Sequence, residues 1–211
     1  MLSLSDGDFL RKLDKDEVNE LPVVKWTGPI HLVANDDHVA ASVAAIRQEK
    51  VLGFDTETKP TFKKGQQHHP ALVQLAGEES VFLFRIGCLR QLEPLQQLLS
   101  DPAILKVGVG LGQDVAQLQA VLPFSPGGFL DLGEEARKAG LKNRGLRTLA
   151  AGFFGVRISK RAQCSNWSTS KLQPYQISYA ATDAWISREI YLTMERLGLL
   201  DPAFQAEMVP E

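Results

Sequence analysis

Two apolar segments joined by a short turn constrain the fold of this chain most strongly. Pro70–Ala76 and Ser80–Ile86 flank Gly77-Glu78-Glu79, a combination that is typical of a β-hairpin. The rest of the chain mostly alternates helix-like and strand-like segments, as α/β proteins do. Because a hairpin joins antiparallel strands, part of the sheet must be antiparallel. The sequence therefore predicts an α/β fold with a mixed β-sheet flanked by α-helices.

The other strands and helices are predicted from apolar runs and from the turn residues between them. Val51–Thr58 is apolar and β-branched and ends at Lys59-Pro60, which is typical of a buried strand. Asn35-Asp36-Asp37 can cap the helix that follows it. The further predicted strands are Ile30–Ala34 and Ile104–Gly110, and the predicted helices span about Asp37–Glu49, Gln91–Leu99, Gln113–Val121, Gly133–Ala139, Leu146–Phe154 and Pro174–Leu197.

Composition favours one soluble domain. The chain has 211 residues, 44% of them hydrophobic and 23% charged, and no apolar run approaches the length of a membrane span. The N-terminus has no apolar signal-peptide core, and Cys88 and Cys164 form neither a disulfide framework nor a paired zinc motif. We therefore expect a cytoplasmic protein without a membrane partner. Residues 1–22 are charged and are expected to be a partly helical or flexible lead-in to a domain over residues 23–211.

The formal net charge of −2 argues against a large basic surface for sequence-independent DNA binding. It does not exclude a nucleic-acid enzyme. If four carboxylates held two divalent cations, the net charge would rise to about +2. The cations would then supply much of the attraction for phosphate.

Asp55 and Glu57 are candidate metal ligands at the end of the predicted strand Val51–Thr58. Alternate residues of a strand point to one face, so the two carboxylates project together while Thr56 points away. Adjacent anions at the end of a buried strand repel each other unless a cation joins them. Two divalent ions about 4 Å apart can drive phosphodiester hydrolysis, and such ions prefer carboxylate oxygens. An ordinary strand-end turn is the alternative explanation for this pair.

Three later residues extend the set of candidates. Asp114 follows the predicted strand Ile104–Gly110, where an acid that complements a helix dipole is the alternative explanation. Tyr179 and Asp183 lie four residues apart in the long predicted helix, so the phenol and the carboxylate share one helix face. A core tyrosine and a surface aspartate are the alternative for this pair.

Four segments carry a common pattern of motifs: Gly53-Phe54-Asp55-Thr56-Glu57-Thr58, Lys106-Val107-Gly108-Val109-Gly110 followed by Asp114 and Leu118, Cys164-Ser165-Asn166-Trp167-Ser168, and Tyr179-Ala180-Ala181-Thr182-Asp183-Ala184. Together they resemble the DEDDy 3′-5′ exonucleases. The likeness is greatest to the exonuclease domain of the Werner-syndrome helicase, with ribonuclease D more distant. It spans about residues 30–197, and its motifs occur in the family's order and approximate spacing.

This resemblance implies an RNase H-like fold and a metal-dependent 3′-5′ exonuclease that releases 5′-mononucleotides. It implies that Asp55, Glu57, Asp114 and Asp183 hold two Mg²⁺ or Mn²⁺ ions in one active site. Tyr179 would position the attacking water; its usual pKa near 10 favours a neutral hydroxyl in that role.

Substrate contacts are predicted less directly. Thr56 and Lys59 adjoin the first acidic pair, Arg147 belongs to a basic segment before a helix, and Trp167 could frame the site or stack on a base. A core tryptophan is the alternative for Trp167. The polar segment at residues 63–69 is either a substrate contact or a solvated connection. Ala116 stands where the Werner exonuclease has an aromatic residue, so a stacking contact and a duplex-end preference do not carry over.

The leading hypothesis is an enzyme that acts on DNA 3′ ends. A ribonuclease D-like trimmer of RNA 3′ ends is the second, and an inactive nucleic-acid or protein-binding module is the third. The presence of all four acids and the tyrosine counts against the inactive module. The chain has neither a helicase nor the C-terminal helical modules of ribonuclease D, so we expect it to find its substrate alone or through a protein partner. The sequence does not indicate an oligomeric state.

Overall fold

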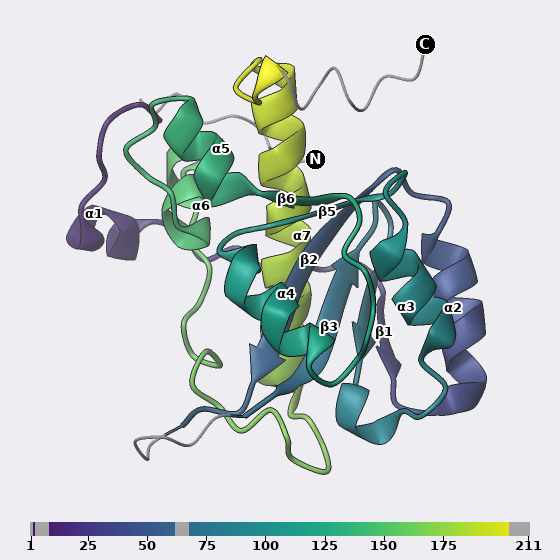
Figure 1. Cartoon of the computed structure of the whole chain (residues 1–211). Coiled ribbons are helices and arrows are strands. Elements are labelled where there is room, and N and C mark those ends of the chain that lie inside the picture. The colour runs from purple at the N-terminus through teal and green to yellow at the C-terminus, as the bar shows by residue number, and fades with distance from the viewer. Residues whose placement is uncertain (1, 3–8, 62–67, 203–211) are drawn as a thin grey trace.

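The computed structural model describes residues 2, 9–61 and 68–202, and its centre is a mixed β-sheet with helices on both faces (Figure 1). In this part of the chain the sheet has six strands in the order β1-β4-β3-β2-β5-β6. The strands are β1 (Ile30–Val33), β2 (Val51–Thr58), β3 (Pro70–Ala76), β4 (Val81–Phe84), β5 (Leu105–Gly108) and β6 (Phe129–Asp131).

Both kinds of strand pairing occur in this sheet. The central strands β2, β3 and β4 are antiparallel, and β3 and β4 form the predicted hairpin. β1 pairs in parallel with β4, while β5 and β6 continue the sheet in parallel on the other side of β2. The prediction of a mixed sheet in an α/β fold is confirmed.

The helices divide between the two faces of the sheet. Phe54 of β2 belongs to an apolar cluster with Leu111 of α4, whereas Leu83 of β4 belongs to a cluster with Ala184 of α7. Thus α2, α3 and α4 cover one face, and α7 crosses the other, where α5 and α6 pack beside it. The helices are α1 (Lys15–Glu20), α2 (Val39–Ile46), α3 (Glu93–Ser100), α4 (Leu111–Gln119), α5 (Leu132–Lys138), α6 (Leu146–Phe154) and α7 (Pro174–Arg196).

Several details differ from the sequence prediction. Strand β6 was not predicted, and α4 begins at Leu111 because Gly110 adopts a left-handed turn with φ 78° directly before it. Asp131 ends β6 and joins two helices: its carboxylate accepts from the backbone N–H of Leu111 and of Gly133. The strand and the start of α4 are therefore fixed together by one acidic side chain.

The N-terminal segment is attached to the domain by hydrogen bonds. Asn143 accepts from Leu13 N and donates to Arg11 O, and the Arg157 side chain donates to Leu21 O. The boundary near residue 22 stays a prediction. Of the polar segment at 63–69, residues 63–67 lie outside the described residues. Within the residues described, no helix has both the length and the apolar character that a membrane crossing requires.

Candidate active site

Three of the predicted metal ligands converge where β2 meets α7. Asp55 and Glu57 come from the end of β2, and Asp183 comes from the middle of α7. A ligand oxygen from each of the three lies within 4.8 Å of the others. The alternation of a β-strand turns Asp55 and Glu57 to one face, as the sequence predicted, and in the structure this is the face that α7 covers. The structure therefore brings together carboxylates that are about 130 positions apart in sequence.

Tyr179 joins this cluster because it lies one helical turn before Asp183. The start of α7 is held by Gln176, whose side-chain oxygen accepts from Gln173 N and whose amide donates to Ser165 Oγ and Asn166 O. These bonds tie the segment around Trp167 to the first turns of α7. The helix and this segment therefore form one support for Tyr179.

Burial and mutual repulsion raise the pKa values of the clustered acids. Burial raises the pKa of Asp55 well above its usual value, and the charges of Asp183 and Asp114 add to that shift. Burial raises the pKa of Glu57 to about 10, with Asp55 the largest of the neighbouring charges that add to it. Burial raises the pKa of Asp183 to about 7, although the Tyr179 hydroxyl favours its charged form. Near neutral pH, this cluster therefore binds either protons or cations.

The donor set fits divalent cations. Oδ1 of Asp183 is buried without a hydrogen-bond partner among the described residues, although a buried carboxylate oxygen normally has one. Neighbouring carboxylate oxygens are the ligands that Mg²⁺ and Mn²⁺ prefer. A cation between these side chains would satisfy Asp183 Oδ1 and remove the repulsion within the cluster.

Asp114 lies near the three-carboxylate cluster but outside it. It comes from the first turn of α4 on the opposite face of the sheet, and its charge contributes to the raised pKa values of Asp55 and Glu57. Burial raises the pKa of Asp114 itself, the nearby Thr56 hydroxyl opposes that shift, and the charge of Asp131 adds to it. The structure thus places the fourth predicted acid, Asp114, beside the cluster, on α4 rather than on β2 or α7.

A hollow of about 400 Å³ opens above the acidic cluster. Asp55, Glu57, Tyr179 and Asp183 contribute to its wall, which also includes the first turn of α6 and the segment from Ile158 to Lys160. The backbone N–H groups at the start of α6 have no side-chain cap. Such a helix start favours an anionic group in the hollow.

The predicted substrate contacts have different outcomes in the structure. Thr56 and Arg147 line the hollow, but the Arg147 guanidinium already donates to Ile158 O and to Asn19 Oδ1. Lys59 follows β2 directly and is not part of the hollow's wall. Trp167 is 1% exposed and packs 6.0 Å from the Tyr179 ring. Of the two alternatives for Trp167, this burial favours the core tryptophan over a ring that stacks on a base.

Sequence reasoning missed other residues of the wall. Lys160 is exposed and lines the hollow together with Ser159 and Gln163. These residues lie in an irregular segment without periodicity, so the sequence offered no signal except their position before the Cys164–Ser168 motif.

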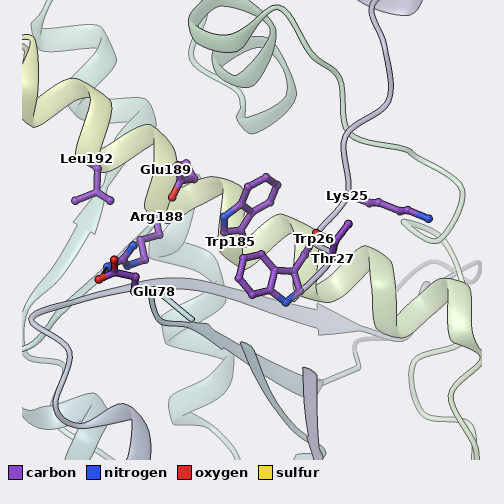
Figure 2. A pocket seen from close by; sticks show the side chains of 8 residues that line it. All are labelled: Lys25, Trp26, Thr27, Glu78, Trp185, Arg188, Glu189 and Leu192. Carbon is purple, nitrogen blue, oxygen red and sulfur yellow. Dashed lines mark ion pairs between the residues drawn. The ribbon is translucent and has the colours of Figure 1, made fainter. Parts of the chain in front are cut away.

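A second hollow, of about 320 Å³, lies further along α7 (Figure 2). Trp26 and Trp185 meet there with ring centroids 5.6 Å apart, and Arg188 forms ion pairs with Glu49 and Glu78. Here the charge of Glu78 is paired with Arg188, whereas the carboxylate group found among the described residues, Asp55, Glu57 and Asp183, lies at the first hollow.

Comparisons with known proteins match most of the chain to one family. Residues 30–198 match the 3′-5′ exonuclease domain family. The human exonuclease mut-7 homolog is 30% identical over 211 residues, covering 86% of this chain and 24% of the relative. A ribonuclease D from Gluconacetobacter diazotrophicus is 32% identical over 178 residues, covering 81% of this chain and 44% of the relative. The mouse bifunctional 3′-5′ exonuclease/ATP-dependent helicase WRN is 34% identical over 155 residues, covering 70% of this chain and 11% of the relative.

A solved structure shares the fold. The Aedes aegypti Nibbler EXO domain superposes with a TM-score of 0.74 at 23% identity, covering 95% of this chain and 99% of that domain. The predicted RNase H-like α/β fold is confirmed by this likeness. The chain spans less than half of the length of each of the three curated relatives.

Proposed function

This chain belongs to the 3′-5′ exonuclease family, in the DEDD group of the RNase H-like superfamily, and we propose that it removes 5′-mononucleotides from the 3′ ends of DNA. The observation that carries the proposal is the convergence of Asp55, Glu57 and Asp183 within 4.8 Å at the wall of an open hollow. Terminal phosphodiester hydrolysis is the chemistry that such a carboxylate group supports in a metal-dependent exonuclease.

We assign the divalent cations to the acidic cluster. Asp55, Glu57 and Asp183 would hold them, with Asp114 completing the site from α4. When bound, a pair of Mg²⁺ or Mn²⁺ ions supplies neutralisation of the phosphate charge, activation of water and stabilisation of the leaving 3′-oxygen. The clustered acids release their protons as the cations enter, so cation binding strengthens as pH rises.

Tyr179 acts as a neutral hydroxyl. Burial raises the pKa of Tyr179 above its usual value, and the charges of Asp183 and Glu57 add to that shift. A phenol that keeps its proton can donate a hydrogen bond and orient the attacking water, but it cannot serve as the base. Its place one turn before Asp183 keeps this donor next to the carboxylates.

Positive groups at the rim receive the phosphate backbone. Lys160 is exposed at the hollow and is free to approach a phosphate, whereas Arg147 keeps the segment at Ile158 in place. The start of α6 supplies backbone N–H donors on the same side. The substrate strand would therefore enter over the α6 side of the hollow.

DNA and RNA are the two candidate substrates. The resemblance of the motifs to the Werner exonuclease makes DNA ends the leading candidate, and one mouse relative is a bifunctional 3′-5′ exonuclease/ATP-dependent helicase. The ribonuclease D relative supports RNA ends as the second candidate.

Oligonucleotides of one sequence, as DNA and as RNA, test both the activity and the substrate. With Mn²⁺ or Mg²⁺, the 5′-labelled strand should shorten stepwise and the 3′-labelled strand should release labelled mononucleotide at once, and EDTA should stop both reactions. If the RNA strand is degraded faster than the DNA strand, RNA rather than DNA is the preferred substrate. The Asp55→Asn protein is the matched control for a contaminating nuclease. No shortening of either strand with either cation would contradict the proposal and revive an inactive binding module.

A further inference from the structure

Gln74 lies in an unusual place for an amide side chain. It sits in the middle of β3, directly opposite Asp55 of β2, and is completely buried. Directly opposed residues of an antiparallel pair project from the same face with Cβ atoms about 4.5–5.5 Å apart. Gln74 therefore points to the α7 face of the sheet, the face that carries the acidic cluster.

The other neighbours of Gln74 on this face are apolar. Leu72 and Ala76 lie two residues away on either side of it in β3, and Leu83 is opposite it in β4. All three belong to the apolar cluster that packs against Ala180 and Ala184 of α7. An aliphatic side chain at position 74 would suit this packing, so packing does not explain the amide.

Neither polar atom of the Gln74 side chain has a hydrogen-bond partner among the described residues, and both Nε2 and Oε1 are buried. An unsatisfied buried donor or acceptor costs about 1–3 kcal/mol. Native proteins rarely keep such groups unless a water, an ion or a functional rearrangement satisfies them. The amide therefore points to a partner that a bound form of the site provides.

Asp55 is the nearest candidate by register. One of its oxygens, Oδ1, accepts from Thr56 N at 2.9 Å, which leaves Oδ2 for another donor or a cation. A neutral amide can donate to this carboxylate without cancelling its charge, whereas a lysine or arginine would compete with the cations. Glutamine is thus chemically suited to orient a metal-ligating carboxylate.

We propose that Gln74 is a positioning residue for the metal site: its Nε2 donates to the Asp55 carboxylate when the cations are bound and fixes that carboxylate in its ligating orientation. The inference rests on the proposed role of Asp55 as a ligand. Hydrogen-bond donors behind metal ligands commonly change metal affinity by about 10–100-fold when they are removed.

Gln74→Met tests this proposal, because methionine keeps the length of the side chain and removes the amide. Mn²⁺ affinity, measured without nucleic acid by the electron paramagnetic resonance signal of free Mn²⁺, should fall by about 10-fold or more. The free energy of unfolding without metal should stay the same or rise, since an unsatisfied buried amide is removed. Leu83→Met is the matched control on the same face and should bind Mn²⁺ like the wild type.

Each outcome has a defined meaning. Mn²⁺ binding by Gln74→Met within about twofold of wild type would overturn the role of Gln74 while leaving the metal site intact. Wild-type protein that does not bind Mn²⁺, or that binds it no better than Asp55→Asn, would overturn the proposed function and this inference with it. If Gln74→Met does not fold, as judged by circular dichroism, Gln74→Leu is measured in its place against the same criteria.

Discussion

Gly53 of β2 and Ala184 of α7 are in direct backbone contact: a Cβ atom on Gly53 would lie 1.8 Å from the carbonyl oxygen of Ala184. Gly53 is two residues before Asp55 on the same strand face, and Ala184 follows Asp183. The close approach of strand and helix therefore sets the separation between the carboxylates of Asp55 and Asp183.

Gly53→Ala should force α7 away from β2. Overpacking of this kind commonly lowers the free energy of unfolding by about 1–3 kcal/mol. The added methyl group would collide with backbone atoms of α7, which cannot move aside as a flexible side chain could. Chemical denaturation should show the loss, and exonuclease activity should fall even where the protein is folded. Gly87→Ala is the control, because nothing lies within 4 Å of a Cβ at that position. Wild-type stability and activity in Gly53→Ala would refute this account of the contact.

Asp55→Asn should abolish cation-dependent cleavage. The loss should reach at least ~10³-fold if the cation site supplies several kcal/mol of barrier lowering. Timed degradation of a labelled single strand with Mn²⁺ measures it. Asp16→Asn changes an exposed acid in α1 and should leave the rate unchanged. Full activity in Asp55→Asn would remove Asp55 from the mechanism.

Tyr179→Phe should lower turnover by about 10²-fold while Mn²⁺ affinity and nucleic-acid binding remain. The hydroxyl orients water and is not needed to hold cation or substrate. Single-turnover rates should be compared with Kd values for Mn²⁺ and for an oligonucleotide in Ca²⁺. Because burial raises the pKa of Tyr179, its hydroxyl stays neutral in the working pH range. The pH profiles of the wild-type and Tyr179→Phe rates should therefore have the same shape. A variant that loses Mn²⁺ binding would instead indicate a structural role.

Without metal, stability should decline from about pH 5 to about pH 8. An acid whose pKa is raised by folding binds its proton more tightly in the folded state, so it stabilises the fold below its unfolded pKa and loses that contribution as pH rises. For Asp183 this loss runs from the usual value of 3.8 to about 7, and for Glu57 from 4.5 to about 10.

Thermal unfolding at a series of pH values measures this decline, and Mn²⁺ should remove most of it by replacing the protons. Asp183→Asn, which cannot titrate at that position, should show a shallower decline. A metal-free protein that becomes more stable over this range would contradict the raised pKa values.

Lys160→Ala should weaken substrate binding with little effect on the chemical step. Loss of one phosphate contact should reduce the slope of log Kd against log salt by about 1. Fluorescence anisotropy with a labelled oligonucleotide at several salt concentrations measures it. Lys15→Ala removes an exposed lysine from α1 and serves as the charge-matched control. An unchanged slope in Lys160→Ala would exclude Lys160 from the binding surface.

The sequence predicted those parts of the fold that depend on local pattern. The β3–β4 hairpin followed from its turn residues, and α7 followed from Pro174 and the long helical segment after it. β6 was not predicted because three residues are too few to show a strand pattern. The strand is defined by its pairing with β5, which the local sequence does not reveal. The order β1-β4-β3-β2-β5-β6 depends on contacts between distant segments, which no local pattern encodes.

The acidic cluster was more predictable than its surroundings. Asp55 and Glu57 follow strand alternation, and Tyr179 and Asp183 follow helical spacing, so their shared faces could be inferred before their convergence was known. The role of Gln74 could not be inferred from the sequence, because it depends on Asp55, which lies opposite Gln74 only once β2 and β3 are paired. Trp167 was assigned to two environments because an aromatic motif residue suits both a core and a stacking surface.

The division of the cluster between β2 and α7 has a consequence for synthesis on the ribosome. A growing polypeptide that has emerged only through β6 carries Asp55, Glu57 and Asp114, but neither the phenol nor the fourth acid. Such an unfinished chain cannot gather its carboxylates, although messenger and ribosomal RNA surround it. Cleavage therefore begins only after the 23-residue helix α7 has been synthesised and has docked on the sheet.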